Sequence, residues 1–98
     1  MNTVTVAATQ MACGEDRAAN LAAAEELVRE AAAAGAEVIL LQELFETPYF
    51  CKDQLARHFD LASAAADSPA LARFAAVAAE LEVVLPISFF EQAGNAYF

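Results

Sequence analysis

The stretch that decides the fold is residues 36–50, which read AEVILLQELFETPYF. Large aliphatic side chains run up to a carboxylate, Glu43, and three aromatic residues follow it within seven positions. A run this short and this apolar is typical of a strand buried on both faces in a layered α/β fold. Glu43 is therefore expected at the C-terminal end of a central strand, where open α/β sheets usually carry their chemistry. A partly desolvated carboxylate in that place can act as a general base near neutral pH.

The residues before this strand predict a βαβ unit. Residues 3–10, TVTVAATQ, are rich in β-branched side chains and predict a first strand. Asp16 is suited to cap a helix that runs to about Ala34, and Gly35 supplies a left-handed stop. Strand, helix, stop and second strand form a βαβ unit, so the two strands are expected to be parallel. The alternating apolar residues of the first strand share one face: Val4, Val6 and Ala8.

The predicted first helix is amphipathic. Four apolar residues recur at helical spacing and predict its buried stripe: Leu21, Ala24, Val28 and Ala31. Glu25 and Arg29 are spaced for an i,i+4 ion pair on the solvent face, worth a few tenths of a kcal/mol.

The second half of the chain predicts two more helices and further strands. A short helix is expected near residues 55–62, followed by a helix with Ser68 as N-cap and Pro69 in its first turn. The expected buried residues of that helix are Leu71, Phe74, Ala75, Ala78 and Leu81. Residues 83–90 predict a third strand, in which Pro86 implies an edge or a bulge because it lacks an N–H donor. Residues 93–96 predict a turn, and residues 97–98 the start of a fourth strand.

Composition excludes several classes of protein. With 98 residues the chain is one domain at most, and 59% hydrophobic residues argue against disorder. A net charge of −9 argues against nucleic acid or an anionic membrane as a partner, and it would suit a cationic ligand. No apolar run approaches the ~18 residues of a membrane span. Cys13 and Cys51 form no metal pattern, so a cytoplasmic protein with both thiols reduced is expected.

Three motifs together resemble a known family. They are residues 6–11, VAATQM, on the first strand, residues 35–36 and 42–51, GA and QELFETPYFC, before and after the second, and residues 84–91, VLPISFFE. In this order they resemble the N-terminal part of the nitrilase, or carbon–nitrogen hydrolase, superfamily. The resemblance implies an α/β fold, namely a four-layer α-β-β-α sandwich that starts with the βαβ unit. It also implies that residues 1–98 are the N-terminal part of a single hydrolase domain, truncated after Phe98.

The resemblance implies a chemistry as well. Family members cleave amides with a Cys nucleophile, a Glu base and a Lys that stabilises the oxyanion. Glu43 matches the base and is the expected catalytic residue, whereas the family Cys and Lys have no counterpart in these residues. The implied substrate is a small carbamoylated amine, with no metal or organic cofactor, no nucleic acid and no membrane. A homo-oligomer is implied for the full protein.

Other residues of the motif leave alternatives open. Tyr49 either lines the substrate pocket or packs under the following helix. Glu46 either attracts a substrate ammonium group or is an exposed loop carboxylate, the second being favoured. His58 is expected at the solvent or in a helix seam.

The remaining candidates are given structural roles. Cys13 and Cys51 are expected as small buried side chains and Lys52 as a solvated one. Glu82 stands where relatives often have Gly at a helix end, and a non-Gly residue in that conformation costs about 1 kcal/mol.

Two other functions fit the same sequence. One is a sister hydrolase that acts on N-carbamoyl-β-alanine, a dicarboxylate amide or a nitrile. The other is a non-catalytic acidic binding module, which would need a closed core of its own.

Overall fold

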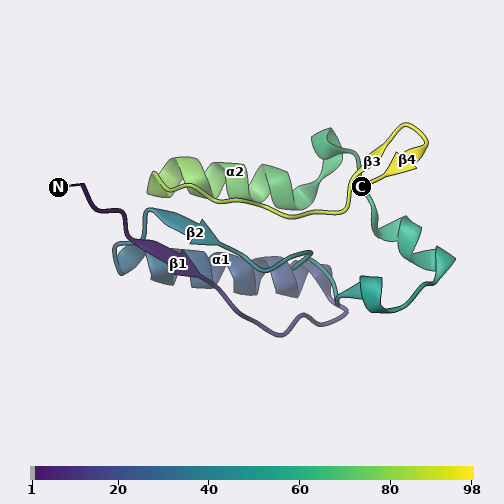
Figure 1. Ribbon diagram of the computed structural model, residues 1–98, viewed down its shortest axis with the longest axis horizontal. Coiled ribbons are helices and arrows are strands. Elements are labelled where there is room, and N and C mark those ends of the chain that lie inside the picture. The colour runs from purple at the N-terminus through teal and green to yellow at the C-terminus, as the bar shows by residue number, and fades with distance from the viewer. Residues whose placement is uncertain (1) are drawn as a thin grey trace.

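The computed structural model describes residues 2–98 and begins with the expected βαβ unit (Figure 1). Strand β1 (Val6–Ala8) leads to helix α1 (Arg17–Ala33), which returns the chain to strand β2 (Val38–Leu40). The two strands are parallel, with Val6 opposite Val38 and Ala8 opposite Leu40. The predicted parallel pairing is confirmed, although the regular strands are shorter than the sequence pattern suggested.

Helix α1 has the predicted ends. The Asp16 side chain accepts a hydrogen bond from the Ala19 N–H at 3.1 Å, which satisfies one of the unpaired first-turn donors. At the other end Gly35 has φ +99°, a conformation that favours glycine, and turns the chain into β2. These caps fix where the first crossover begins and ends.

Short 3₁₀ helices connect β2 to the second long helix. They are η1 (Phe50–Lys52), η2 (Ala56–Leu61) and η3 (Ala65–Asp67), and α2 (Pro69–Leu81) follows. Ser68 caps α2 as predicted, because its side chain accepts from the Leu71 N–H at 3.2 Å. Phe74 is buried as expected, but the rest of the stripe is rotated: Ala70 and Val77 are buried, whereas Ala75 is exposed.

The predicted third strand forms only in part. Residues 83–90 are extended, but they pair with β2 at a single parallel bridge between Val38 and Val84. Ile39 N–H donates to the Val84 carbonyl and Val84 N–H donates to the Glu37 carbonyl, both at 2.9 Å. Pro86 has no N–H to continue this ladder. The bridge nevertheless places β2 in the centre, between β1 and this segment.

The last residues form a separate antiparallel hairpin. Strand β3 (Gln92–Ala93) pairs with β4 (Ala96–Tyr97), and Gly94 in the turn has φ +60°. The turn at residues 93–96 is therefore as predicted. The fourth strand pairs with β3 and not with the parallel sheet.

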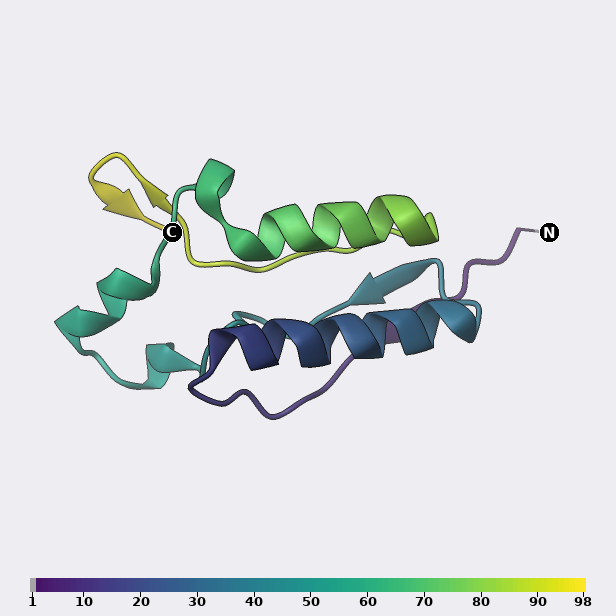
Figure 2. The same cartoon turned by 180° about the vertical axis from the view of Figure 1, so that it is seen from behind.

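Both long helices lie on one face of the parallel sheet, and Figures 1 and 2 show this from opposite sides. Ile39 points to the helices and is fully buried, and the Phe45 ring meets the Phe74 ring edge-on, with centroids 5.4 Å apart. The remaining core residues come from both helices and the strand ends: Leu21, Ala24, Val28, Ala36, Leu41, Ala70 and Val77. The core therefore lies between the sheet and the helices.

The opposite face of the sheet is uncovered among the described residues. Leu40 of the central strand β2 is 52% exposed, and Val6 of the neighbouring strand β1 is 69% exposed. The expectation that β2 is buried on both faces is wrong for this structure, because both helices pack on the Ile39 side. One apolar face remains open to solvent.

Glu25 and Arg29 form the predicted ion pair at 2.9 Å, but they do not lie on a purely solvated face. Glu25 also accepts from Arg73 of α2 at 2.7 Å, and Arg29 binds Glu80 of the same helix. The hydrogen bonds from Arg73 and then Arg29 lower the pKa of Glu25. The pair therefore ties α1 to α2.

Neither these helices nor any other helix within residues 2–98 has the length and apolar character that a membrane crossing requires.

Candidate active site

Glu43 lies on a turn that follows the central strand β2. Its neighbours in the chain anchor this turn in the core, since Leu41 is 5% and Phe45 1% exposed. Glu43 itself is exposed, so the expectation that it is partly desolvated is not met. The cause is the uncovered sheet face, onto which the end of β2 opens. The structure thus places a carboxylate on a fixed turn at the C-terminal end of the central strand.

Hydrogen bonds to two other segments, the loop at residues 11–13 and the extended segment at Ser88, hold this turn. The Gln42 side chain accepts from the Met11 N–H at 2.9 Å and donates to Cys13 Sγ at 3.3 Å. Leu44 N–H donates to Ser88 Oγ at 3.2 Å. Cys13 Sγ donates to the Phe45 carbonyl at 3.2 Å. The residues on both sides of Glu43 are therefore fixed, whereas its carboxylate faces solvent.

Asn20 is a buried side chain that joins two loops by hydrogen bonds, and the sequence analysis did not predict this role. Its Nδ2 donates to the Glu46 and Gly14 carbonyls, both at 2.8 Å, and its Oδ1 accepts from the Gly14 N–H at 2.9 Å. It joins the loop before α1 to the turn that carries Glu43. A polar side chain beside Leu21 in an otherwise apolar stripe was the available signal, because a buried amide needs all its partners.

Glu43 lines an open depression of about 320 Å³ at the ends of β2 and the neighbouring extended segment. Leu40 and Leu41 form one wall, and Pro86, Ile87 and Ser88 form the other. The depression is largely apolar apart from Glu43 and Ser88.

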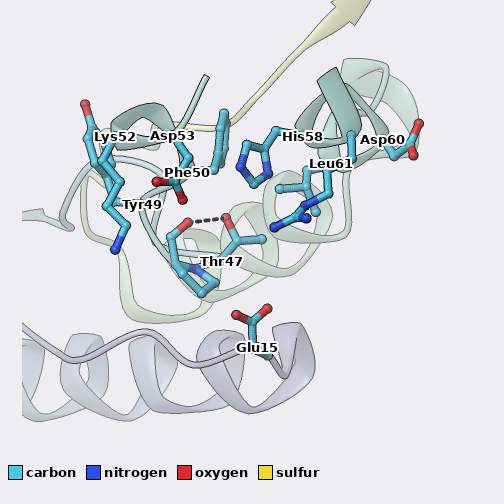
Figure 3. Close-up of a pocket in the computed structure, with 11 residues that line it drawn as sticks. Glu15, Thr47, Tyr49, Phe50, Lys52, Asp53, His58, Asp60 and Leu61 are labelled. Atoms are coloured by element: carbon cyan, nitrogen blue, oxygen red, sulfur yellow. Dashed lines mark hydrogen bonds between the residues drawn. The ribbon is translucent and has the colours of Figure 1, made fainter. Parts of the chain in front are cut away.

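Tyr49 lines a different hollow. This cavity of about 440 Å³ lies between the loop before α1 and the 3₁₀ helices, and Figure 3 shows its lining side chains. The negative charge of Glu43, followed by that of Cys51, raises the pKa of Tyr49. Tyr49 therefore lies within electrostatic reach of Glu43 but does not share its depression. His58 lines the same cavity, half-buried, with its ring 5.5 Å from the Phe50 ring.

Glu46 is not the exposed carboxylate that the sequence favoured. It is 8% exposed, and its Oε1 has no hydrogen-bond partner, the Arg17 Nε lying 4.0 Å away. Burial raises the pKa of Glu46, and the charge of Arg17 opposes this only in part.

The two cysteines differ from each other. Both are free thiols, and Cys13 is packed as expected, with burial raising the pKa of its thiol. Cys51 is exposed, which contradicts the expected packing, because it lies on the open 3₁₀ segment. Lys52 is exposed as predicted. Residues 2–98 contain no cluster of three or more His, Cys, Asp or Glu side chains arranged to hold a metal ion.

The fold and this turn define a layered α/β protein whose candidate site centres on a carboxylate at a strand end. Residues 5–98 match the sequence model of the carbon-nitrogen hydrolases. The chain belongs to the carbon-nitrogen hydrolase family.

Similar proteins agree with this assignment. N-carbamoylputrescine amidase from Arabidopsis thaliana is 50% identical over 97% of the chain, and the counterpart from Oryza sativa is 47% identical. Citrullinase from Francisella tularensis is 40% identical over the whole chain. The crystal structure of a carbon-nitrogen hydrolase from Helicobacter pylori G27 superimposes with a TM-score of 0.83 at 28% identity, over 96% of the chain. The chain spans about a third of the length of these proteins, 32% for the Arabidopsis and Helicobacter proteins and 34% for citrullinase.

Proposed function

We propose that these residues are the N-terminal third of an amidase that hydrolyses N-carbamoylputrescine to putrescine, ammonia and carbon dioxide, a step of polyamine biosynthesis. Glu43 is its general base. The observation that carries the proposal is the position of Glu43, on an anchored turn at the end of the central strand, in a chain 50% identical to a protein named for this reaction. The nucleophilic Cys and the Lys of the family mechanism lie outside these 98 residues.

In the proposed reaction Glu43 moves two protons. Its carboxylate first takes the thiol proton, and the thiolate then attacks the carbonyl carbon of the ureido group. One C–N bond breaks, the departing nitrogen takes that proton, and a thiocarbamate remains on the Cys sulfur. Glu43 next removes a proton from the water that attacks the thiocarbamate carbon, and the C–S bond breaks as the sulfur takes that proton. The released carbamic acid loses carbon dioxide, which breaks the second C–N bond and frees the other amine. A carboxylate on a turn with a hydrogen-bonded backbone suits this role, because a general base must be held in position relative to the groups whose protons it moves.

Citrulline is the second candidate substrate, since the Francisella relative is named citrullinase. Both molecules end in a ureido group and differ at the far end, which is an ammonium in one and an amino acid in the other. The net charge of −9 favours the cationic substrate. The same assay can be run with the substrates of sister hydrolases, which are N-carbamoyl-β-alanine, dicarboxylate amides and nitriles.

The proposal extends to the rest of the domain. The apolar sheet face at Val6 and Leu40 is proposed to pack against a second sheet, which gives the four-layer α-β-β-α sandwich. The full-length protein, meaning a chain of the relatives' length that contains these residues, is proposed to be a cytoplasmic homo-oligomer without a cofactor. Light scattering of that protein measures the oligomeric state.

The test is ammonia release by the full-length protein from N-carbamoylputrescine, citrulline and N-carbamoyl-β-alanine. Glu43→Gln keeps the shape of the side chain but cannot accept a proton, so kcat/KM should fall by about 10²- to 10⁴-fold. KM should change much less, because the far end of the substrate is held elsewhere. Glu26→Gln, on the exposed side of α1, is the matched control.

Two outcomes would contradict the proposal. If the wild-type protein releases ammonia only from another substrate, that substrate replaces N-carbamoylputrescine in the proposal. A Glu43→Gln variant that retains more than about a tenth of wild-type kcat/KM would remove Glu43 from the role of base.

A further inference from the structure

Leu44, directly after Glu43, has an unusual backbone conformation. Its φ is +52°, in the left-handed region that branched side chains rarely adopt. Such a conformation persists only where surrounding contacts hold it. The structure must therefore contain an interaction that keeps this turn from relaxing.

Ser88 makes a hydrogen bond directly to the strained residue. The Leu44 N–H donates to Ser88 Oγ at 3.2 Å, and Ser88 lies 44 residues away on the extended segment beside β2. Ser88 is half-buried and lines the same depression as Glu43. Pro86, two residues earlier, lies in the same wall. The Ser88 hydroxyl thus links the turn after β2 to the neighbouring extended segment, and Glu43 lies at the depression between them.

Other hydrogen bonds hold the turn before and after Glu43, and they show what the bond between Leu44 and Ser88 adds. Gln42 is held by Met11, and the Glu46 carbonyl is held by Asn20. These bonds, together with the bond from Cys13 Sγ to the Phe45 carbonyl, fix where the turn enters and leaves. Among the described residues, the bond to Ser88 is the hydrogen bond that the peptide between Glu43 and Leu44 makes. The strain of a left-handed leucine is of the same order as one net hydrogen bond. Losing the Ser88 bond is therefore sufficient to let this peptide adopt other orientations.

We propose that Ser88 is a positioning residue of the Glu43 site: its hydroxyl holds the left-handed turn at Leu44 and thereby sets the direction of the Glu43 carboxylate. The catalytic part rests on the proposed role of Glu43, whereas the structural part concerns the turn alone. Ser88 acts through Leu44 and does not touch the substrate.

The test compares three variants of the full-length protein. Ser88→Ala removes the acceptor, and Ser88→Thr keeps it. Ser68→Ala removes another serine oxygen that accepts a backbone N–H at 3.2 Å, on α2 and away from Glu43. Two readouts are used: steady-state kinetics with N-carbamoylputrescine, and hydrogen exchange of the Leu44 amide.

Ser88→Ala should lower kcat by about 2- to 10-fold with KM nearly unchanged, the effect of losing one hydrogen bond that orients the turn carrying the general base. The Leu44 amide should exchange faster by a similar factor. Ser88→Thr should keep kcat and the exchange rate of the Leu44 amide close to their wild-type values. Ser68→Ala should lower the thermal midpoint while leaving kcat and Leu44 exchange at wild-type values.

A Ser88→Ala variant with an unchanged Leu44 exchange rate would overturn the proposal. So would a kcat loss in Ser68→Ala equal to that in Ser88→Ala, since general destabilisation would then explain both. Faster exchange with unchanged kcat would reject the link between the turn and Glu43. Wild-type protein without any amidase activity would overturn the proposed function and the catalytic part, while the exchange data would still decide whether Ser88 holds the turn.

Discussion

Glu43 and Glu46 are three residues apart on one turn and have opposite environments. Glu43 is exposed beside the end of β2, whereas Glu46 is buried next to Arg17 with one oxygen unpartnered. Phe45, which lies between them in the chain, is buried in the core, and Glu46 directly after it is held there by the bond from Asn20 to its carbonyl. A buried carboxylate without full compensation destabilises the folded state when it is charged.

The pH dependence of stability should report the burial of Glu46. Because burial raises its pKa above the unfolded value, the stability that this group contributes is present at low pH and is lost as the pH rises through the folded pKa. Glu46→Gln should therefore stabilise the full-length protein at pH 7 by about 1 kcal/mol. The advantage should shrink toward pH 4.

The measurement is the thermal midpoint of both proteins between pH 4 and pH 8. Glu26→Gln is the control, since that side chain is exposed. If Glu46→Gln lowers the midpoint at pH 7 and not at pH 4, the ion pair with Arg17 outweighs the burial cost and the prediction is wrong.

At this scale the sequence predicted the position of Glu43 but not the residues that fix its turn. The apolar run into Glu43 determines the strand and its end, and both are local properties. The partners Ser88 and Asn20 are 44 and 26 residues away from the groups they bind, so only the folded chain brings them together. The burial of Glu46 depends on the same long-range packing.

At the scale of elements, the helix ends were predictable because caps act locally. Asp16, Ser68 and Gly35 each perform the expected role. The buried stripe of α2 was less predictable, since an alanine-rich helix presents small apolar residues on several faces. Packing against α1 and β2 selects Ala70, Phe74 and Val77.

Helix α2 ends in a strained residue that can be improved. Glu82 has φ +55° and ψ +46°, the left-handed conformation in which a side chain is unfavourable. Glu82→Gly should therefore raise the free energy of unfolding by up to about 1 kcal/mol, less the entropy that glycine adds to the unfolded chain. Urea unfolding of the full-length protein measures the change.

The matched control for this prediction is Ala34→Gly at the end of α1. Ala34 has φ −82°, so glycine relieves no strain there and should destabilise the protein by roughly 0.5–1 kcal/mol. Equal effects of the two substitutions would show that the conformation of Glu82 carries no cost.

At the scale of the whole molecule, the described residues form two layers with one apolar surface open. That surface crosses both strands and the adjacent extended segment: Val4, Val6, Leu40 and Val84 are all more than half exposed. Contiguous apolar surface of this kind marks an interface. The sequence predicted the alternating face of the first strand, but not which side the helices would cover.

The 98-residue chain expressed alone should therefore be partly molten or aggregated. It should bind a dye such as ANS, show poorly dispersed amide NMR signals and release no ammonia from N-carbamoylputrescine. Leu40→Lys should reduce dye binding by the isolated chain without loss of helicity, because the residue lies outside the core. In the full-length protein the same change should be destabilising.

A cooperative thermal transition and dispersed spectra in a monomer of the isolated chain would contradict this prediction. They would show that two layers suffice for a stable fold. Amide hydrolysis by the isolated chain, abolished in Cys51→Ser, would in addition identify the exposed thiol as a nucleophile.

The order of the strands has a consequence for synthesis on the ribosome. Strand β1 pairs with β2, the next strand to be made, across α1. Strand β2 then pairs with Val84 of the following extended segment, across the three 3₁₀ helices and α2. No pairing within residues 2–98 has to wait for a strand from a more distant part of the chain. The nascent chain can therefore assemble the parallel sheet and the two helices on its one covered face as it emerges, since early segments fold first during translation. For that interval the open apolar face has no cover, so it is the surface through which the nascent chain would be prone to aggregate.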